Sequence, residues 1–165
     1  IEYMTQLLSE LSSYNNGEKL SLSQTNTVTF LKNLVLSFAS SVLDTDIEFT
    51  SRIASDLPPL MADTLKLKQT LLNLLNNAKD AVLSCPDSES PAIRLDAEHI
   101  GQTLRIKISD AKDVPTIFEP FVTHKRSGTG LGLAIARRII TAHNGSIQVE
   151  SILGKGSVFT IVLPI

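Results

Sequence analysis

The residues that could do chemistry gather first in the segment RSGTGLGLAIARRI, which runs from Arg126 to Ile139. Gly128, Gly130 and Gly132 let the backbone approach a ligand closely, because a glycine has no side chain in the way. An apolar run of helical spacing follows, and the first turn of a helix offers unpaired N–H groups and the positive end of the helix dipole. The segment therefore predicts a phosphate-binding turn at the start of a helix.

Polar side chains around these glycines fit the same chemistry. Lys125 and Arg126 precede them and would add charge-assisted contacts to a polyphosphate, while Thr129 would supply a hydroxyl. The segment is neither a Walker loop nor a Rossmann fingerprint, because no Gly-Lys-Ser/Thr ending follows and the glycine spacing differs. A glycine-rich turn before a helix also occurs without any ligand, so other residues must support the prediction.

A second candidate site lies in the helical segment QTLLNLLNNAKDAV. Asn73 and Asn77 are four residues apart and project from the same face of a helix, where two amide oxygens can meet a metal ion or its waters. Mg²⁺ prefers oxygen ligands, keeps several waters and commonly contacts substrate phosphates as well. The alternative is a polar helix face with two chance asparagines.

Asp110 is a third candidate, because it follows an alternating apolar run formed by Leu104, Ile106 and Ile108. A carboxylate at the end of a strand only accepts hydrogen bonds and could take the amino hydrogens of adenine, which would select adenine over guanine. The alternative is a solvated aspartate in a turn.

The hydrophobic pattern predicts the elements that must position these candidates. Apolar residues with a 3.6-residue period predict helices, and alternating apolar residues bounded by turn residues predict strands. Helices are expected over about residues 27–42, 64–83 and 130–143, and strands over about 47–53, 93–97, 104–108 and two closing segments framed by Asn144-Gly145 and Gly154-Lys155-Gly156. In the second helix Asp63 is the expected N-cap, and the expected inward side chains are Leu65, Leu71, Leu72, Leu75 and Val82. The pattern predicts an α+β fold, a two-layer α/β sandwich with a mixed sheet of about five strands and about three helices on one face.

Composition narrows the classes of function. The chain has 165 residues, 42% of them hydrophobic, a formal charge of −2 and a pI near 5.9, which suits one domain and gives no global reason to expect nucleic acid or an anionic membrane as a partner. Cys85 is the one cysteine, so no internal disulfide is possible and a cytoplasmic setting is expected. No run approaches the roughly twenty apolar residues that cross a bilayer.

These segments, in this order, resemble the GHKL ATPase superfamily and, within it, the catalytic domain of sensor histidine kinases. The matching segments are NLLNNAKDA for the asparagine box, Asp110 for the nucleotide-binding aspartate, IFEPF for the phenylalanine box, GTGLGLAIA for the glycine box, and the closing HNGSIQVES and GKGSVFTIVLP. The resemblance implies the Bergerat (GHKL) fold. It also implies that residues 1–16 end the second helix of a dimerisation and histidine-phosphotransfer hairpin, and that residues 17–165 form the ATP-binding domain.

The resemblance implies ATP and Mg²⁺ as ligands. Asn77 would hold Mg²⁺ with Asn73 assisting, and Asp110 would bind adenine. The remaining ATP-binding residues that the resemblance implies are Asp80, His124, Lys125, Arg126, Gly128, Thr129, Gly130, Leu131, Gly132, Leu133 and Thr160.

The resemblance also implies phosphoryl transfer rather than hydrolysis. Hydrolysing relatives carry a glutamate one helical turn before the metal asparagine, whereas this chain has Asn73, and an amide cannot take a proton from water. In histidine kinases the acceptor is a histidine on the upstream hairpin, and the receiver domain of a response regulator accepts the phosphoryl group next. His99, His124 and His143 lack the expected helical setting with an acidic neighbour, so we expect the acceptor upstream, in a homodimeric parent that could be anchored in the inner membrane.

Two positions depart from the family pattern. The first glycine box normally reads Asp-x-Gly-x-Gly, whereas Asp110 is followed here by AKDVPTIFEPF. Either this box is degenerate or a short stretch of the loop is missing from the sequence, and the second interpretation is favoured because every other motif is intact. Asp80 stands where many members carry a lysine that contacts phosphate. A pseudokinase without nucleotide affinity is the alternative function, and a serine kinase of the anti-sigma type or a hydrolysing ATPase is disfavoured by Asn73.

Overall fold

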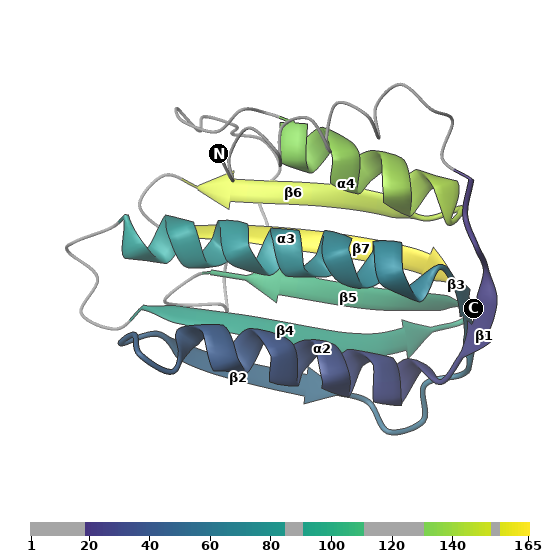
Figure 1. Ribbon diagram of the computed structural model, residues 1–165, viewed down its shortest axis with the longest axis horizontal. Coiled ribbons are helices and arrows are strands. Elements are labelled where there is room, and N and C mark those ends of the chain that lie inside the picture. The colour runs from purple at the N-terminus through teal and green to yellow at the C-terminus, as the bar shows by residue number, and fades with distance from the viewer. Residues whose placement is uncertain (1–18, 85–90, 111–130, 153–155) are drawn as a thin grey trace.

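A computed structural model describes residues 19–84, 91–110, 131–152 and 156–165 (Figure 1). The elements in chain order are β1 (Ser23–Thr25), α2 (Thr27–Val42), β2 (Glu48–Ile53), β3 (Leu60–Ala62), α3 (Thr64–Leu83), β4 (Ala92–Ile100), β5 (Thr103–Ser109), α4 (Leu131–Ala142), β6 (Ser146–Ile152) and β7 (Gly156–Pro164). The predicted segment 1–16 lies outside the described residues. No described helix is both long enough and apolar enough to cross a membrane.

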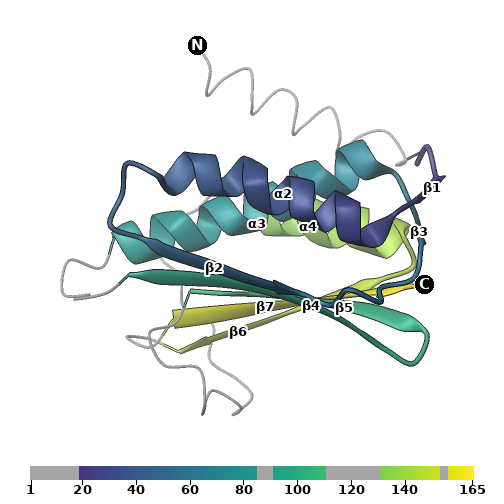
Figure 2. The ribbon, with the colours of Figure 1, turned by 90° about the horizontal axis from the view of Figure 1, so that it is seen from below.

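The main sheet has five strands in the order β2-β4-β5-β7-β6. β2 pairs with β4 in parallel, and all other neighbours are antiparallel, so the predicted mixed sheet is confirmed. All three described helices cover one face of this sheet (Figure 2). A second sheet of two short strands, β1 and β3, was not predicted, because three residues are too few to display an alternating pattern.

Capping side chains explain where the two long helices begin. The side chain of Asn26 accepts a hydrogen bond from the Thr29 N–H at 2.9 Å, and that of Asp63 accepts one from the Lys66 N–H at 3.1 Å. Each bond satisfies one of the N–H groups that the first turn of a helix leaves unpaired. The predicted bounds of both helices, 27–42 and 64–83, are confirmed.

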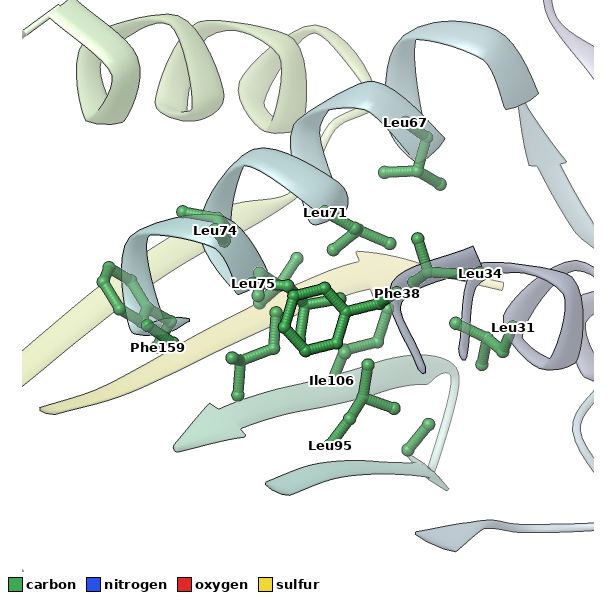
Figure 3. Close-up of a cluster of buried hydrophobic side chains, with 14 of the residues drawn as sticks. Leu31, Leu34, Phe38, Leu67, Leu71, Leu74, Leu75, Leu95, Ile106 and Phe159 are labelled. Carbon is green, nitrogen blue, oxygen red and sulfur yellow. The ribbon is translucent and has the colours of Figure 1, made fainter. Parts of the chain in front are cut away.

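The core lies between the helices and the covered face of the sheet (Figure 3). Phe38 of α2 meets Phe49 of β2 edge to face, with ring centroids 4.8 Å apart. The largest side chains that the fold buries completely are Phe38, Leu31, Leu34, Leu60, Leu67, Leu71, Leu74, Leu75, Ile93, Leu95, Leu104 and Ile106. The prediction for Leu65 was wrong, because it lies in the first turn of α3 with 76% of its surface exposed and Leu67 takes the inward position.

The turn between α4 and β6 is formed by Asn144 and Gly145, and each position favours the residue type found there. Asn144 has a φ of 59°, in the left-handed region where asparagine is better tolerated than most residues. The Gly145 N–H then donates to the Ile140 carbonyl at 2.9 Å, which ends the helix. A Cβ at Gly145 would lie 2.5 Å from the Val162 carbonyl oxygen, so the turn packs directly on β7.

A buried histidine joins the end of α4 to the start of α3. His143 is 6% exposed, its Nδ1 lies 2.8 Å from the Ile139 carbonyl, and its Nε2 lies 3.0 Å from the Asp63 nitrogen. The Nδ1–H therefore donates and Nε2 accepts, which defines the tautomer. Asp63 Oδ2 also accepts from the Ser21 N–H at 3.0 Å, so one cluster connects the lead-in to β1 with α3 and α4.

Replacing Gly145 with alanine is expected to destabilise the fold by about 3 kcal/mol, because the new methyl group would overlap the backbone of β7. Gly101→Ala is the matched control. Gly101 has a φ of 60° but nothing within 4 Å of an added Cβ, so its cost is expected to be only about 1 kcal/mol, from the backbone conformation. Urea denaturation of both variants measures the difference, and equal losses would contradict the proposed overlap.

The lowered pKa of Asp63 predicts that the stability of the fold depends on pH. Burial works to raise the pKa of its carboxyl, but hydrogen bonds from the Ser21 and Lys66 N–H groups and the nearby Lys66 charge outweigh burial and lower that pKa below its ordinary value. The ionised group therefore stabilises the fold above about pH 4, and this contribution disappears as pH falls through the lowered pKa.

Asp63→Ala should thus cost about 1–2 kcal/mol at neutral pH, and the gap to the unmodified chain should narrow below about pH 4. Denaturation curves at several pH values measure it, with the exposed Asp46→Ala as the control. A gap that stays constant down to pH 2 would show that the charge of Asp63 plays no part.

Candidate functional site

One face of α3 carries three of the predicted site residues. Asn73, Asn77 and Asp80 follow one another at intervals of four and three residues, so they lie along one side of the helix. Asn73 and Asn77 are partly buried beside the core stripe, whereas Asp80 is exposed. The two amides are therefore held in place by packing while still reachable from outside the core.

The first turn of α4 lies beside this face of α3. A Cβ built on Gly132 would lie 3.7 Å from the Nδ2 atom of Asn73. α3 and α4 run side by side over the sheet in both Figure 1 and Figure 2. Asn73 and Gly132, which are about sixty residues apart in the sequence, thus lie side by side in the fold.

Leu133 is 39% exposed near the start of α4. The predicted ATP-binding residues that lie outside the described residues are His124, Lys125, Arg126, Gly128, Thr129 and Gly130. Leu131 begins α4, but its side chain is not among those described.

Asp110 lies directly after β5 and is only 7% exposed, so the alternative of a solvated turn aspartate is wrong. Its backbone N–H donates to the Ser157 carbonyl at 3.0 Å, and its Oδ1 accepts a short hydrogen bond from the Ser157 N–H. The backbone of Ser157, at the amino end of β7, therefore holds both the backbone and the carboxylate of Asp110. The carboxyl end of β5, the amino end of β7 and the amino end of α4 all lie on the same side of the molecule, at the left in Figure 1.

Ser157 belongs to this site and was missed from the sequence. It is 4% exposed, and its Oγ lies 3.0 Å from the Oγ of Ser151 on β6. The sequence pattern could have revealed it, because Ser157 is two and four residues before the buried Phe159 and Ile161. Alternate residues of a strand share one face, so Ser157 faces the helix layer. A hydroxyl at an inward strand position next to a buried carboxylate is a usable hydrogen-bonding group.

Thr160 does not join the other predicted residues. Its neighbours Phe159 and Ile161 face the helices, so the Thr160 side chain faces the opposite side of the sheet. There it pairs in register with Lys107 on β5 and Gln148 on β6. We therefore exclude Thr160 from the candidate site.

The described histidines have structural roles. His143 is buried in hydrogen bonds with backbone groups, as described above. His99 lies on β4 with its Nε2 3.3 Å from the Asp56 carboxylate, which is a strand setting rather than a helical one. A hollow of about 450 Å³ also lies along the outer side of α4, but it is lined by Ala134, Arg137, Arg138, Thr141 and Ala142, none of which is a predicted site residue.

The sequence is similar to those of sensor kinases. Residues 62–165 match the family described as histidine kinase-, DNA gyrase B- and HSP90-like ATPase. Over the full length of the chain, 31% of residues are identical to the signal transduction histidine-protein kinase AtoS of Escherichia coli K12, of which the match covers 28%. The chain therefore spans less than a third of that relative.

Solved structures agree with the sequence match. Full-length ShkA in complex with AMPPNP superposes with a TM-score of 0.73 and 29% identity, covering 96% of this chain and 34% of ShkA. The histidine kinase ThkA, solved in complex with the response regulator protein TrrA, superposes with a TM-score of 0.74 and 25% identity, covering 99% of this chain and 47% of ThkA. The two helices that meet at Gly132, the buried aspartate after β5 and these matches agree, and the chain belongs to the histidine kinase-, DNA gyrase B- and HSP90-like ATPase family.

Proposed function

We propose that this chain binds ATP with Mg²⁺ and delivers the γ-phosphoryl group to a histidine outside the described residues. The observation that carries the proposal is the closeness of α3 to the first turn of α4, where a Cβ on Gly132 would lie 3.7 Å from the Nδ2 atom of Asn73. A metal-binding group and a phosphate-binding turn are useful to one ligand only if they are adjacent. Binding of AMPPNP by the similar ShkA supports the same conclusion.

Asn77 and Asn73 are the residues that would hold Mg²⁺. Their side chains carry neutral amide oxygens, and triphosphate oxygens and water would complete the oxygen set that the ion prefers. When bound, the ion neutralises charge on the phosphates during transfer. The partial burial of both asparagines keeps their amides in place before the ligand arrives.

Asp110 is the residue proposed to recognise adenine. Oδ1 is held by the Ser157 N–H, and the Asp110 backbone is held by the Ser157 carbonyl, so the carboxylate has a defined orientation at the end of β5. An acceptor in a defined orientation distinguishes an amino group from a carbonyl oxygen on the base, because a mismatch leaves a buried polar group without its partner.

Asn73 favours transfer over hydrolysis. It occupies the position where a base would have to activate water, and its amide cannot accept a proton there. The described residues therefore position and orient the nucleotide for another nucleophile, which lowers the barrier mainly through positioning and electrostatics.

The proposed acceptor is a histidine on an upstream helical hairpin of a homodimeric parent, with the domain on the cytoplasmic side. The chain spans 28% of AtoS, which leaves ample length for such a hairpin in that relative. The receiver domain of a response regulator is the proposed next partner, supported by the complex of ThkA with TrrA. Residues 1–16 would then be the end of the hairpin.

Replacing Asn77 with alanine is expected to reduce ATP affinity at least tenfold in the presence of Mg²⁺ and to remove its dependence on Mg²⁺, because one ligand of the ion is lost. Isothermal titration calorimetry with and without Mg²⁺ measures both effects. Asn76→Ala is the matched control, because Asn76 is the exposed neighbour on a different side of α3.

An Asn77→Ala variant that still needs Mg²⁺ and binds as tightly as the original chain would refute the metal assignment. Absence of saturable binding by the unmodified chain at millimolar ATP would overturn the proposed function and favour the pseudokinase.

Replacing Asp110 with asparagine is expected to lower ATP affinity about tenfold or more. The asparagine oxygen can keep the bond to the Ser157 N–H, but its NH₂ group would face the amino group of adenine, and two donors repel. Calorimetric titration measures the loss, and thermal denaturation shows whether the fold persists. Asp46→Asn, an exposed carboxylate outside the site, is the control, and an equal affinity of the Asp110 variant would rule out the adenine role.

A further inference from the structure

We propose that residues 1–18 dock as a helix in the hollow along the outer side of α4, with Glu10 facing Arg137. The hollow has a volume of about 450 Å³, and its lining residues are Ala134, Arg137, Arg138, Thr141 and Ala142. The inference goes beyond the proposed function, because it concerns an interaction surface and requires no nucleotide.

The shape of the hollow favours a helix over a small molecule. Its five lining residues all belong to α4, so its sides are open to solvent. A small molecule is usually enclosed from several directions, which one helix cannot provide. A second helix needs only one face, because rows of side chains on one helix pack into the grooves between rows on another.

The hollow also favours an acidic occupant. Arg137 is exposed and Arg138 is half-buried, and α4 has no acidic residue between Leu131 and Ala142. Guanidinium groups form their strongest contacts with carboxylates, so a complementary helix carries acidic residues beside its apolar ones.

Residues 1–18 have this composition, since Glu2, Glu10 and Glu18 are their only charged residues. Apolar residues recur with helical spacing up to a Ser-Ser-Tyr-Asn-Asn-Gly turn signal. These apolar residues are Tyr3, Met4, Leu7, Leu8 and Leu11. On the predicted helix Glu10 flanks this apolar stripe on the same side as Tyr3, whereas Glu2 lies on the opposite face.

The fold brings the start of the described chain to the end of α4. The Lys19 carbonyl accepts a hydrogen bond from Lys66 Nζ at 3.1 Å, which places it at the first turn of α3. The Asp63 N–H just before that turn bonds to His143, directly after α4. In Figure 1 the described chain begins next to this end of α4, at the right. Residues 1–18 are therefore attached at one end of the hollow.

The length of the segment matches the hollow. The 12 residues of α4 extend about 18 Å, and a helix ending at Leu11 would extend about 16 Å. The chain from Ser12 to Glu18 can span up to about 23 Å, so the predicted helix can turn back and lie along α4.

The other segments outside the described residues lack this combination. Residues 85–90 carry acidic residues but no large aliphatic or aromatic side chain. Residues 111–130 mix acidic residues with Lys112, Lys125 and Arg126, and residues 153–155 contain a lysine. Residues 1–18 alone combine an apolar stripe with charges of negative sign only.

Tyrosine fluorescence tests the docking without a label, because the chain has no tryptophan and both of its tyrosines, Tyr3 and Tyr14, lie in residues 1–18. Tyr14→Phe leaves Tyr3 as the one reporter. Acrylamide, a neutral quencher, then measures the accessibility of Tyr3 in the full chain and in a synthetic peptide of residues 1–18 with the same change. Docking should make quenching severalfold weaker in the chain than in the peptide.

A charge exchange identifies the partner of Glu10. In the same background, Arg137→Glu and Glu10→Lys should each shift the ratio of docked to free segment about fivefold toward free, because an ion pair becomes a pair of like charges. The double variant exchanges the two charges and should restore the protection of Tyr3. Glu2→Lys and Arg52→Glu, which changes an exposed arginine of β2, are the matched controls and should leave quenching unchanged.

Equal quenching in the chain and the peptide would overturn the inference, as would single variants that match the controls or a double variant no better protected than the single ones. Protection that rises with protein concentration would also overturn it and indicate a second copy as the occupant. Circular dichroism verifies that the variants fold. Failure of the unmodified chain to bind ATP would overturn the proposed function and leave this docking intact, so the two failures are distinguishable.

Discussion

The packing of α3 on the sheet is the constraint on which the site depends. Leu67, Leu71, Leu74 and Leu75 are all fully buried on one stripe of this helix. Each buried leucine contributes about 2 kcal/mol, so rotating α3 about its axis would be very costly. Because the rotation is set by these leucines, the directions of Asn73 and Asn77 beside the stripe are set with it.

A second constraint fixes α4 relative to α3. The bond from the Asp63 N–H to His143 Nε2 joins the start of one helix to the end of the other, and the turn at Gly145 seats the end of α4 on β7. A helix held at its carboxyl end and packed along its length has a defined position at its amino end. Gly132 therefore lies beside Asn73 because of contacts made more than two helical turns away.

The sheet supplies the third part of the site. β7 lies between β5 and β6, so its first residues reach Asp110 on one side and Ser151 on the other. This arrangement explains why the polar residues at the strand ends tolerate burial, since each forms hydrogen bonds across the ladder. Strands hold Asp110, the residue proposed to bind the base, and helices hold Asn73 and Asn77, the residues proposed to bind the metal ion.

The sequence by itself determined the fold class, the bounds of α2 and α3, and the residues of the asparagine and glycine motifs. Local rules suffice for these features, because Asn26 and Asp63 cap helices within one turn and the leucine spacing shows the buried side. The burial of Asp110 needed the structure, since a strand-end aspartate looks the same in sequence whether it is solvated or enclosed.

Only the tertiary structure decided which groups meet. Ser157 enters the site and Thr160 leaves it because β7 presents one face to the helices, and the partner of Ser157 is Ser151 because β6 pairs with β7 in one register. The contact of Gly132 with Asn73 likewise arises from helix packing across the sheet. Periodicity in a sequence shows which residues share one face of a helix or strand. Which faces pack against each other depends on contacts between residues far apart in the sequence, and no local pattern contains that information.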